Sequence, residues 1–327
     1  MTVPYPPAQD PLGYTGAVPH QALFPLLGLP LVVRSNSPAV MDAAEWAFGR
    51  WRRLAKKFID PIRPLDLTLV VHPPDDAPYR PQPFIYRVYG DCFLAASGGN
   101  LLMAQRDQGV AVGLVTSEIV ADDALFRYQV LECLALWLAS RHDRTPVHGA
   151  ALLANGRALL LLGPSLAGKS TLSYACLRAG FQLLAEDVVF VSSQKGLKLW
   201  GHTRQISLTP AAPALFPELA DIPAKTLGNG KVKLTVDLSP ESAAPLNPHA
   251  GGTIVCLLQR HPARKSGVKP LEVPQLVQAL RERADPGFRL DPRMPELVAA
   301  MARGSAYRFT NGHDLPGAVA LLKQLTH

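Results

Sequence analysis

The sequence is poor in cysteine, in long apolar runs and in charged residues, which make up 18% of the chain. Its four cysteines, Cys92, Cys133, Cys176 and Cys256, are widely spaced and form no Cys-x-x-Cys pair. This pattern excludes a disulfide framework or zinc ribbon and predicts reduced thiols in a cytoplasmic protein. No apolar run approaches the ~18 residues of a membrane-spanning helix, so no membrane association is expected. Residues 1–20 contain no Lys or Arg, and a secretory signal is not predicted.

Composition and charge then narrow the class of protein. Hydrophobic residues make up 48% of the 327 residues, enough for one large domain or two of ordinary size. The 33 basic and 26 acidic residues give a net charge of +7, which favours anionic partners such as nucleotides. Small basic clusters at 50–57 and 260–269 are explained by a solvated helix face and a solvated loop. Because no aromatic and basic stripe accompanies them, nucleic acid is not an expected partner.

Proline and glycine mark the expected domain organisation. Residues 1–20 read as an extended Pro-rich tail, and residues 21–144 as a smaller N-terminal α+β domain, a candidate for substrate recognition. Residues 145–327 form the expected catalytic domain. Periodicity predicts helices over 38–58 and 122–140 and strands at 67–72, 84–89, 101–104 and 110–115. In the second domain it predicts strands at 147–153, 158–162, 201–208 and 254–258, a hairpin at 228–234, and helices at 169–179 and 314–325.

A complete phosphate-binding pattern, G-x-x-x-x-G-K-[ST], lies between the 158–162 strand and the 169–179 helix. Its residues are Gly163, Pro164, Ser165, Leu166, Ala167, Gly168, Lys169 and Ser170, and Thr171 follows as a further expected nucleotide contact. The two glycines let the backbone bend around phosphate oxygens, while loop amides and the helix N-terminus direct partial positive charge at them. Lys169 would reach the β- and γ-phosphates of ATP, and the Ser170 hydroxyl would ligate Mg²⁺.

An acidic pair follows about sixteen residues after this pattern. Glu186 and Asp187 end the apolar run 181–185, where a turn can bring both side chains towards one cleft. Phosphoryl transfer to a hydroxyl needs a proton acceptor and a carboxylate that holds the metal ion. A solvated acidic pair at a strand end is the alternative. His148, in a His-Gly pair before the hairpin, is either structural or a further member of the site.

Together these segments resemble the catalytic core of HPr kinase/phosphorylase and its relatives. The resemblance rests on His148-Gly149, on the 163–171 pattern, and on the 180–187 run that closes with Glu186-Asp187. That group includes kinases of lasso-peptide precursors and small-molecule serine kinases, and its core also looks like the nucleotide site of phosphoenolpyruvate carboxykinase. The resemblance implies an α/β fold with a C-terminal P-loop kinase core beside the smaller N-terminal α+β domain. It covers residues ~145–195 well and extends weakly to ~260.

The resemblance also implies roles for single residues. Lys169 and the loop amides would hold the phosphates of ATP, Ser170 and Asp187 would hold Mg²⁺, and Glu186 would be the general base, with His148 close to the reacting phosphate. Glu186 and Asp187 can exchange roles, because the sequence does not show which faces the acceptor. Thr171 stands where HPr kinases usually carry glutamate, Glu186 replaces aspartate, and the later E-x-R-G-x-G run is absent. These departures argue against HPr itself as the acceptor and against a reverse phosphorylase activity.

Three later cations are candidates for further phosphate contacts. Arg204 lies in the predicted 201–208 strand, and Lys231 and Lys233 lie on one face of the predicted 228–234 hairpin. Negative charge builds up on the equatorial oxygens during phosphoryl transfer, so an extra cation would help. An exposed strand face explains the two lysines equally well.

The sequence as a whole predicts an ATP- and Mg²⁺-dependent kinase that phosphorylates a Ser/Thr-type hydroxyl of a peptide, protein or small molecule. One alternative is a nucleotide-dependent binding or regulatory module that transfers no phosphoryl group. Another is a P-loop NTPase acting on nucleic acid, which the scattered basic residues disfavour. No sequence feature identifies the acceptor or the oligomeric state.

Overall fold

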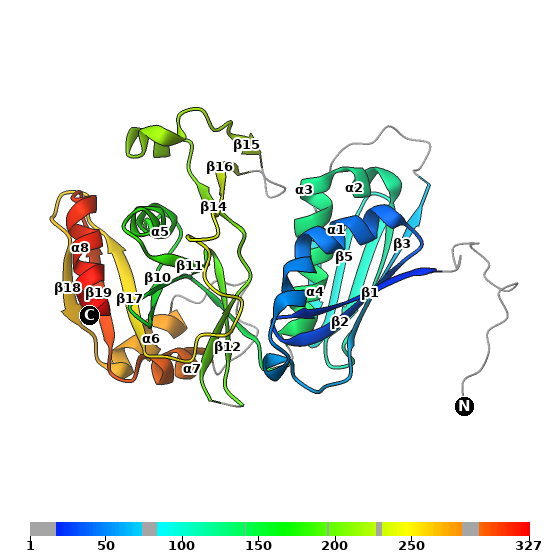
Figure 1. Ribbon diagram of the computed structural model, residues 1–327, viewed down its shortest axis with the longest axis horizontal. Coiled ribbons are helices and arrows are strands. Elements are labelled where there is room, and N and C mark those ends of the chain that lie inside the picture. Colours follow the sequence, from blue (N-terminus) through cyan, green and yellow to red (C-terminus); the bar gives the residue numbers. More distant parts are fainter. Residues whose placement is uncertain (1–17, 74–83, 141, 195, 227–230, 283–293) are drawn as a thin grey trace, which may run out of the picture. The chain divides into compact units, whose positions relative to one another are not determined.

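The computed structural model describes residues 18–73, 84–140, 142–194, 196–226, 231–282 and 294–327, and its fold is mixed α/β with several mixed sheets (Figure 1). The chain divides into two compact units. The first comprises the described residues up to His142 together with Lys231, and the second comprises the other described residues from Asp143 onward. Most of the Pro-rich tail and the turn residues 228–230 lie outside the described residues. None of the described helices combines the length and the apolar character that crossing a membrane requires.

The first unit is built on a seven-stranded sheet in the order β1-β2-β3-β7-β6-β5-β4. The strands are β1 (His20–Leu26), β2 (Leu29–Ser35), β3 (Leu65–His72), β4 (Ile85–Tyr89), β5 (Cys92–Ser97), β6 (Asn100–Gln105) and β7 (Val110–Thr116). The third strand in this order, β3, pairs parallel with β2 and β7, while the other pairs are antiparallel. Leu65, Leu67 and Leu69, alternate residues of β3, are buried, as a sheet covered on one face requires.

The helices of the first unit, α1 (Pro38–Phe48), α2 (Ser117–Ala121), α3 (Asp123–Leu125) and α4 (Cys133–Ala139), lie over this sheet (Figure 1). The predicted 38–58 helix ends earlier than expected, at Phe48. Two short 3₁₀ turns, Gly49–Arg53 and Lys56–Phe58, continue it because Gly49 is a poor helix former and Trp51 is still buried there. The predicted 122–140 helix is formed, with a π-helical stretch at Phe126–Glu132 before α4.

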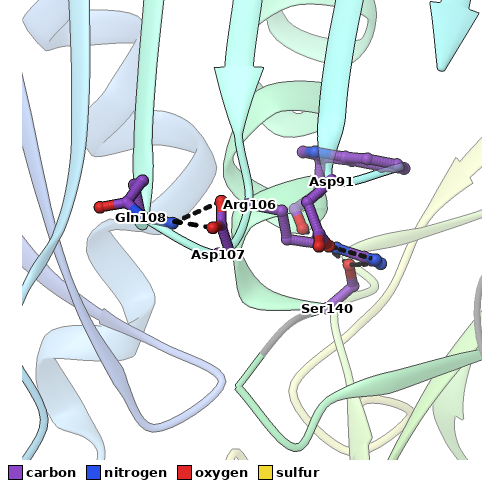
Figure 2. Close-up of polar contacts among 6 residues, drawn as sticks. Asp91, Arg106, Asp107, Gln108 and Ser140 are labelled. Atoms are coloured by element: carbon purple, nitrogen blue, oxygen red, sulfur yellow. Dashed lines mark hydrogen bonds and ion pairs between the residues drawn. The ribbon is translucent and has the colours of Figure 1, made fainter. Parts of the chain in front are cut away.

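Arg106 joins the end of α4 to the β5–β6 hairpin in this unit. Figure 2 shows its guanidinium between Asp91 and Ser140. Nε and Nη2 donate to Asp91 Oδ1 at 2.9 and 2.7 Å, and Nη1 reaches Ser140 Oγ at 3.4 Å. The guanidinium also lies 4.9 Å from the centre of the Trp137 ring. Because the Arg106 guanidinium donates twice to the Asp91 carboxylate and also lies over the Trp137 ring, we interpret its role as structural.

The second unit contains a six-stranded sheet in the order β11-β9-β10-β17-β19-β18. Its strands are β9 (Ala150–Ala154), β10 (Arg157–Leu162), β11 (Gln182–Ala185), β17 (Thr253–Arg260), β18 (Gly267–Pro270) and β19 (Ala306–Asn311). The three central strands, β10, β17 and β19, run parallel, so their carboxyl ends meet at one edge. The β9–β10 hairpin turns through Asn155 and Gly156, both with positive φ, as the sequence predicts.

Helices cover both faces of this sheet. Figure 1 shows α5 (Lys169–Arg178) beside α8 (Leu315–Thr326), and both pack on the face that carries Leu159 and Leu161. On the opposite face, Leu160 and Leu162 pack with α6 (Val273–Glu282) and α7 (Met294–Ala302). Burial on both sides explains why β10 is an unbroken apolar run instead of an alternating one.

Two smaller sheets complete the second unit. One has the order β13-β12-β8, from β8 (Thr145–His148), β12 (Val188–Ser192) and β13 (Lys198–Gly201); the other has the order β14-β16-β15, from β14 (Gln205–Leu208), β15 (Lys225–Thr226) and β16 (Val232–Asp237). The predicted 147–153 strand is therefore divided at Gly149, whose N–H donates to Asp187 O. The predicted 201–208 strand is also divided, because Arg204 lies in a bend between β13 and β14.

Candidate active site

The 163–168 loop connects β10 to α5 through a tightly packed turn. Leu166 and Gly168 both have positive φ, 66° and 90°. A β-carbon on Gly163 would lie 3.1 Å from Ala167 Cβ and 3.2 Å from the Leu258 carbonyl oxygen, so the loop is closed against the end of β17. The loop therefore leads directly into the N-terminus of α5, where unpaired helix amides favour an anion.

Lys169 is the first residue of α5, yet its side chain turns back into the loop. The residue is only 8% exposed, and Nζ donates to the carbonyl oxygens of Gly163 (2.8 Å) and Pro164 (3.2 Å). A buried ammonium group needs such partners because desolvation of the charge is costly. The loop thus holds a cation among its own backbone groups, where phosphate oxygens can replace the carbonyls as partners.

Asn311, the last residue of β19, supports the loop from the other side. Its residue exposure is 9%, and its Nδ2 donates to Ala167 O at 2.9 Å. The same amide occupies the space into which a β-carbon on Gly168 would point. Sequence reasoning missed Asn311, because a single asparagine at a strand end carries no local signal for a contact 144 residues away.

Gly168→Ala should therefore destabilise the second unit for two reasons: alanine disfavours the positive φ at this position, and its β-carbon would collide with the Asn311 amide. Gly180 is the matched control, since its φ of 93° is similar and no atom lies within 4 Å of its would-be β-carbon. We expect Gly180→Ala to lower the free energy of unfolding by about 1 kcal/mol, and Gly168→Ala by about 2–3 kcal/mol. Chemical denaturation measures both. Equal losses in the two variants would contradict the packing of Asn311 against Gly168.

The acidic pair forms the turn between β11 and β12, and its two side chains point to different surroundings. Glu186 is partly buried: its Oε1 accepts from the Ser170 hydroxyl at 3.0 Å, and its N–H donates to Thr203 Oγ1 at 3.2 Å. The Asp187 side chain is 66% exposed, and its Oδ1 lies 3.5 Å from His148 Nδ1. The turn therefore brings Glu186 to Ser170 and Asp187 to His148.

Gly201 determines how closely β13 approaches this turn. A β-carbon at this position would overlap the backbone carbonyl of Leu184, two residues before Glu186. The close approach brings Thr203 within hydrogen-bonding distance of the Glu186 amide. Neither Gly201 nor Thr203 was singled out by sequence reasoning, since both act through tertiary contacts.

The electrostatic surroundings of Glu186 are balanced between opposing effects. Burial, and secondly the charge of Asp187, raise the pKa of Glu186 to about 7. The Ser170 hydrogen bond, a backbone hydrogen bond from Ser207 and the charge of Lys233 act in the opposite direction. Lys233, on β16, is thus near enough to Glu186 for its charge to be felt. Arg204 and Lys231 are both exposed, and their roles as phosphate contacts stay predictions.

This raised pKa leads to a prediction about stability. The folded protein holds the Glu186 proton more tightly than the unfolded chain, so ionisation of Glu186 lowers the free energy of unfolding as pH rises from about 4.5 to about 7. Glu186→Gln removes this loss. We therefore compare the free energy of unfolding of the variant with that of the wild type, in the absence of divalent cations. This difference should favour the variant by about 2 kcal/mol more at pH 8 than at pH 4.5. Denaturant titrations at both pH values test this, with the exposed Glu272→Gln as control; the same pH dependence in both variants would contradict it.

The oxygen atoms around Ser170 suit a hard divalent cation. The Ser170 hydroxyl and the Glu186 carboxylate are adjacent, and Mg²⁺ prefers such oxygen ligands, completing its octahedron with water and substrate phosphates. Within the described residues, no group of three or more His, Cys, Asp or Glu side chains is arranged to hold a metal ion. A cation held by Ser170 and Glu186 would keep its other positions for water and substrate phosphates.

No family model and no curated protein matches the sequence. Among solved structures, the Hpr(Ser) kinase/phosphatase from Coxiella burnetii is similar at 16% sequence identity, over 55% of this chain and 92% of that chain, with a TM-score of 0.24. An overlap this low carries no argument about the function of this chain.

Proposed function

We propose that the chain is an ATP-dependent kinase, of the HPr-kinase-like type, that transfers the γ-phosphoryl group to a Ser/Thr-type hydroxyl of a peptide, protein or small molecule. One observation supports this most strongly. The complete 163–170 pattern contains a buried Lys169, and its Ser170 hydroxyl bonds to one member of the acidic pair. A phosphate loop, a cation and two carboxylates are the groups that phosphoryl transfer requires.

The nucleotide would occupy the 163–170 loop, with Lys169 and the first amides of α5 holding its phosphates. Ser170 and Glu186 would hold Mg²⁺, which neutralises charge on the β- and γ-phosphates when bound. This reverses the first assignment made from the sequence, in which Asp187 was the metal ligand. The 3.0 Å contact between Ser170 Oγ and Glu186 Oε1 favours the exchange.

Asp187 would then accept the proton of the acceptor hydroxyl. Its exposed carboxylate is accessible to an acceptor from solution, and His148 beside it can orient or share the proton. In the step, the acceptor oxygen bonds to the γ-phosphorus, the bond from that phosphorus to the β–γ bridging oxygen breaks, and ADP leaves. Lys169, with Lys233 near the acidic pair, would stabilise the charge on the transferring group.

Incubation of the purified protein with Mg²⁺ and ATP labelled in the γ-phosphate, with and without a mixed pool of Ser- and Thr-containing peptides and small hydroxyl compounds, tests the proposal. We expect the label to appear on an acceptor and to disappear when Mg²⁺ is chelated. Saturable ATP binding with no transfer to any acceptor would instead support a nucleotide-dependent regulatory module. No ATP binding would overturn both functions.

A further inference from the structure

Two loops at the carboxyl ends of β17 and β19 are tied together into one surface, which we call the β17–β19 platform (residues 260–266 and 311–314). Four hydrogen bonds join them: His261 N–H to Asn311 O (3.0 Å), His313 N–H to Arg264 O (3.0 Å), Gly312 N–H to Ser266 Oγ (3.1 Å) and Ser266 N–H to Asp314 Oδ1 (2.5 Å). A β-carbon on Gly312 would also overlap the Arg264 carbonyl. The platform is therefore an ordered part of the second unit.

The platform is also attached to the 163–170 loop. Asn311, which belongs to the platform, donates to Ala167 O at 2.9 Å, and the end of β17 closes on Gly163 through Leu258. Asn311, Ala167 and Leu258 are buried, so these contacts fix the position of the platform relative to the loop. Any phosphate held by the loop thus lies at a defined position relative to the platform.

The exposed surface of the platform is cationic. Arg260, Arg264, Lys265 and His313 are exposed, and residues 260–271 contain no Asp or Glu. The platform's one carboxylate, Asp314, accepts hydrogen bonds from Ser266, which lower the pKa of Asp314. That carboxylate is therefore held mainly by Ser266, and it also interacts electrostatically with His313, so it offsets only part of the positive charge of the platform. The cations lie on an exposed loop, as the sequence predicted, and this loop is attached beside the phosphate loop.

The order of strands gives the direction in which a nucleotide would extend. The acidic pair lies at the carboxyl end of β11, on one side of β10, whereas the platform lies beyond β17 on the other side. A γ-phosphate near the acidic pair would place the rest of the nucleotide towards β17 and β19. Two strand spacings, roughly 10 Å, separate β10 from β19. Ligands of such sheets commonly bind outside the carboxyl ends of the strands.

We propose that the β17–β19 platform binds the nucleoside part of the nucleotide, with Arg264, Lys265 and His313 as the contacting side chains. The planar guanidinium and imidazole groups can stack on a purine base, and the ammonium can donate to ribose hydroxyls. The inference rests on the proposed function only in that a nucleotide occupies the 163–170 loop. It adds a determinant of nucleoside recognition separate from the reacting groups.

The test compares ATP with inorganic tripolyphosphate, which lacks base and ribose. Equilibrium dissociation constants are measured by calorimetry at 0.3 M salt for the wild type, for Arg264→Gln/Lys265→Gln, and for Arg303→Gln/Lys323→Gln. The control residues Arg303 and Lys323 are also exposed and lie at the opposite end of the sheet. Lys323 is near the end of α8, which contacts Arg157 at the start of β10. Their substitution removes the same charge, so it reports general electrostatics.

We expect the Arg264/Lys265 variant to lose about tenfold in ATP affinity and to bind tripolyphosphate within about threefold of the wild type. The control should change neither affinity by more than about threefold. Equal losses for the two ligands, or no loss for ATP, would overturn the proposal while leaving the kinase function intact. Failure of the wild type to bind either ligand would instead refute the underlying nucleotide site.

Discussion

Lys169→Ala is expected to lower the rate of phosphoryl transfer by about a thousandfold while the second unit stays folded. Removal of a single charge-stabilising group from such a site typically costs two to three orders of magnitude in rate. The fold should tolerate the change, because the Gly163 and Pro164 carbonyls that accept from Lys169 Nζ can accept from solvent water once the side chain is gone. Initial rates of transfer from labelled ATP and the unfolding midpoint in denaturant measure the two effects.

Lys323→Ala, on the exposed surface of α8, is the matched control for this loss of charge and should retain the wild-type rate. Full activity of Lys169→Ala would contradict the phosphate-binding role of the loop. A variant that fails to fold is distinguished by its denaturation curve, and Lys169→Met then serves as a second substitution that keeps the apolar part of the side chain.

Asp187→Asn is expected to show the second large effect, a loss of about 10²–10⁴ in kcat with ATP affinity within threefold of the wild type. In the proposed mechanism the exposed carboxylate beside His148 would accept the proton of the acceptor, and other groups would make the phosphate and cation contacts. Glu186→Gln should behave differently. Because Glu186 accepts from Ser170, its loss should weaken Mg²⁺-dependent ATP binding as well as the rate.

The two variants therefore separate the two assignments of the acidic pair. Magnesium titrations of ATP binding, combined with single-turnover rates, give an affinity and a rate for each variant. The opposite result would be a loss of rate alone in Glu186→Gln and weakened Mg²⁺-dependent ATP binding in Asp187→Asn. It would make Glu186 the general base and Asp187 the metal ligand, and it would contradict the exchange proposed above. Unchanged rates in both would remove the acidic pair from the mechanism.

The features predicted best from the sequence are those encoded by neighbouring residues. The Asn155-Gly156 turn, the apolar β10 run and the helix that begins at Lys169 each follow from a local pattern of turn residues or periodicity. The sequence placed the acidic pair near the loop but paired Ser170 with Asp187, whereas in the structure the Ser170 hydroxyl donates to Glu186.

The features missed depend on contacts between distant segments. Asn311 at the end of β19 reaches Ala167 past the one intervening strand, β17, and Gly201 lets β13 approach Leu184, but neither residue differs locally from an ordinary strand end. Tertiary packing also divided the strand expected around Arg204, because the chain there leaves one sheet and enters another. Strand propensity alone does not report such a change of partner.

Equilibrium binding of ATP to the wild-type protein, with and without Mg²⁺, is the most direct test of the account. Calorimetry should show one saturable site per chain that Mg²⁺ strengthens and that Lys169→Ala weakens strongly. Bound nucleotide should also raise the denaturation temperature, since it binds the folded state. If the wild type binds no ATP at millimolar concentration, or if Mg²⁺ and Lys169 make no difference to its affinity, the assignment of a nucleotide site to the 163–170 loop is wrong.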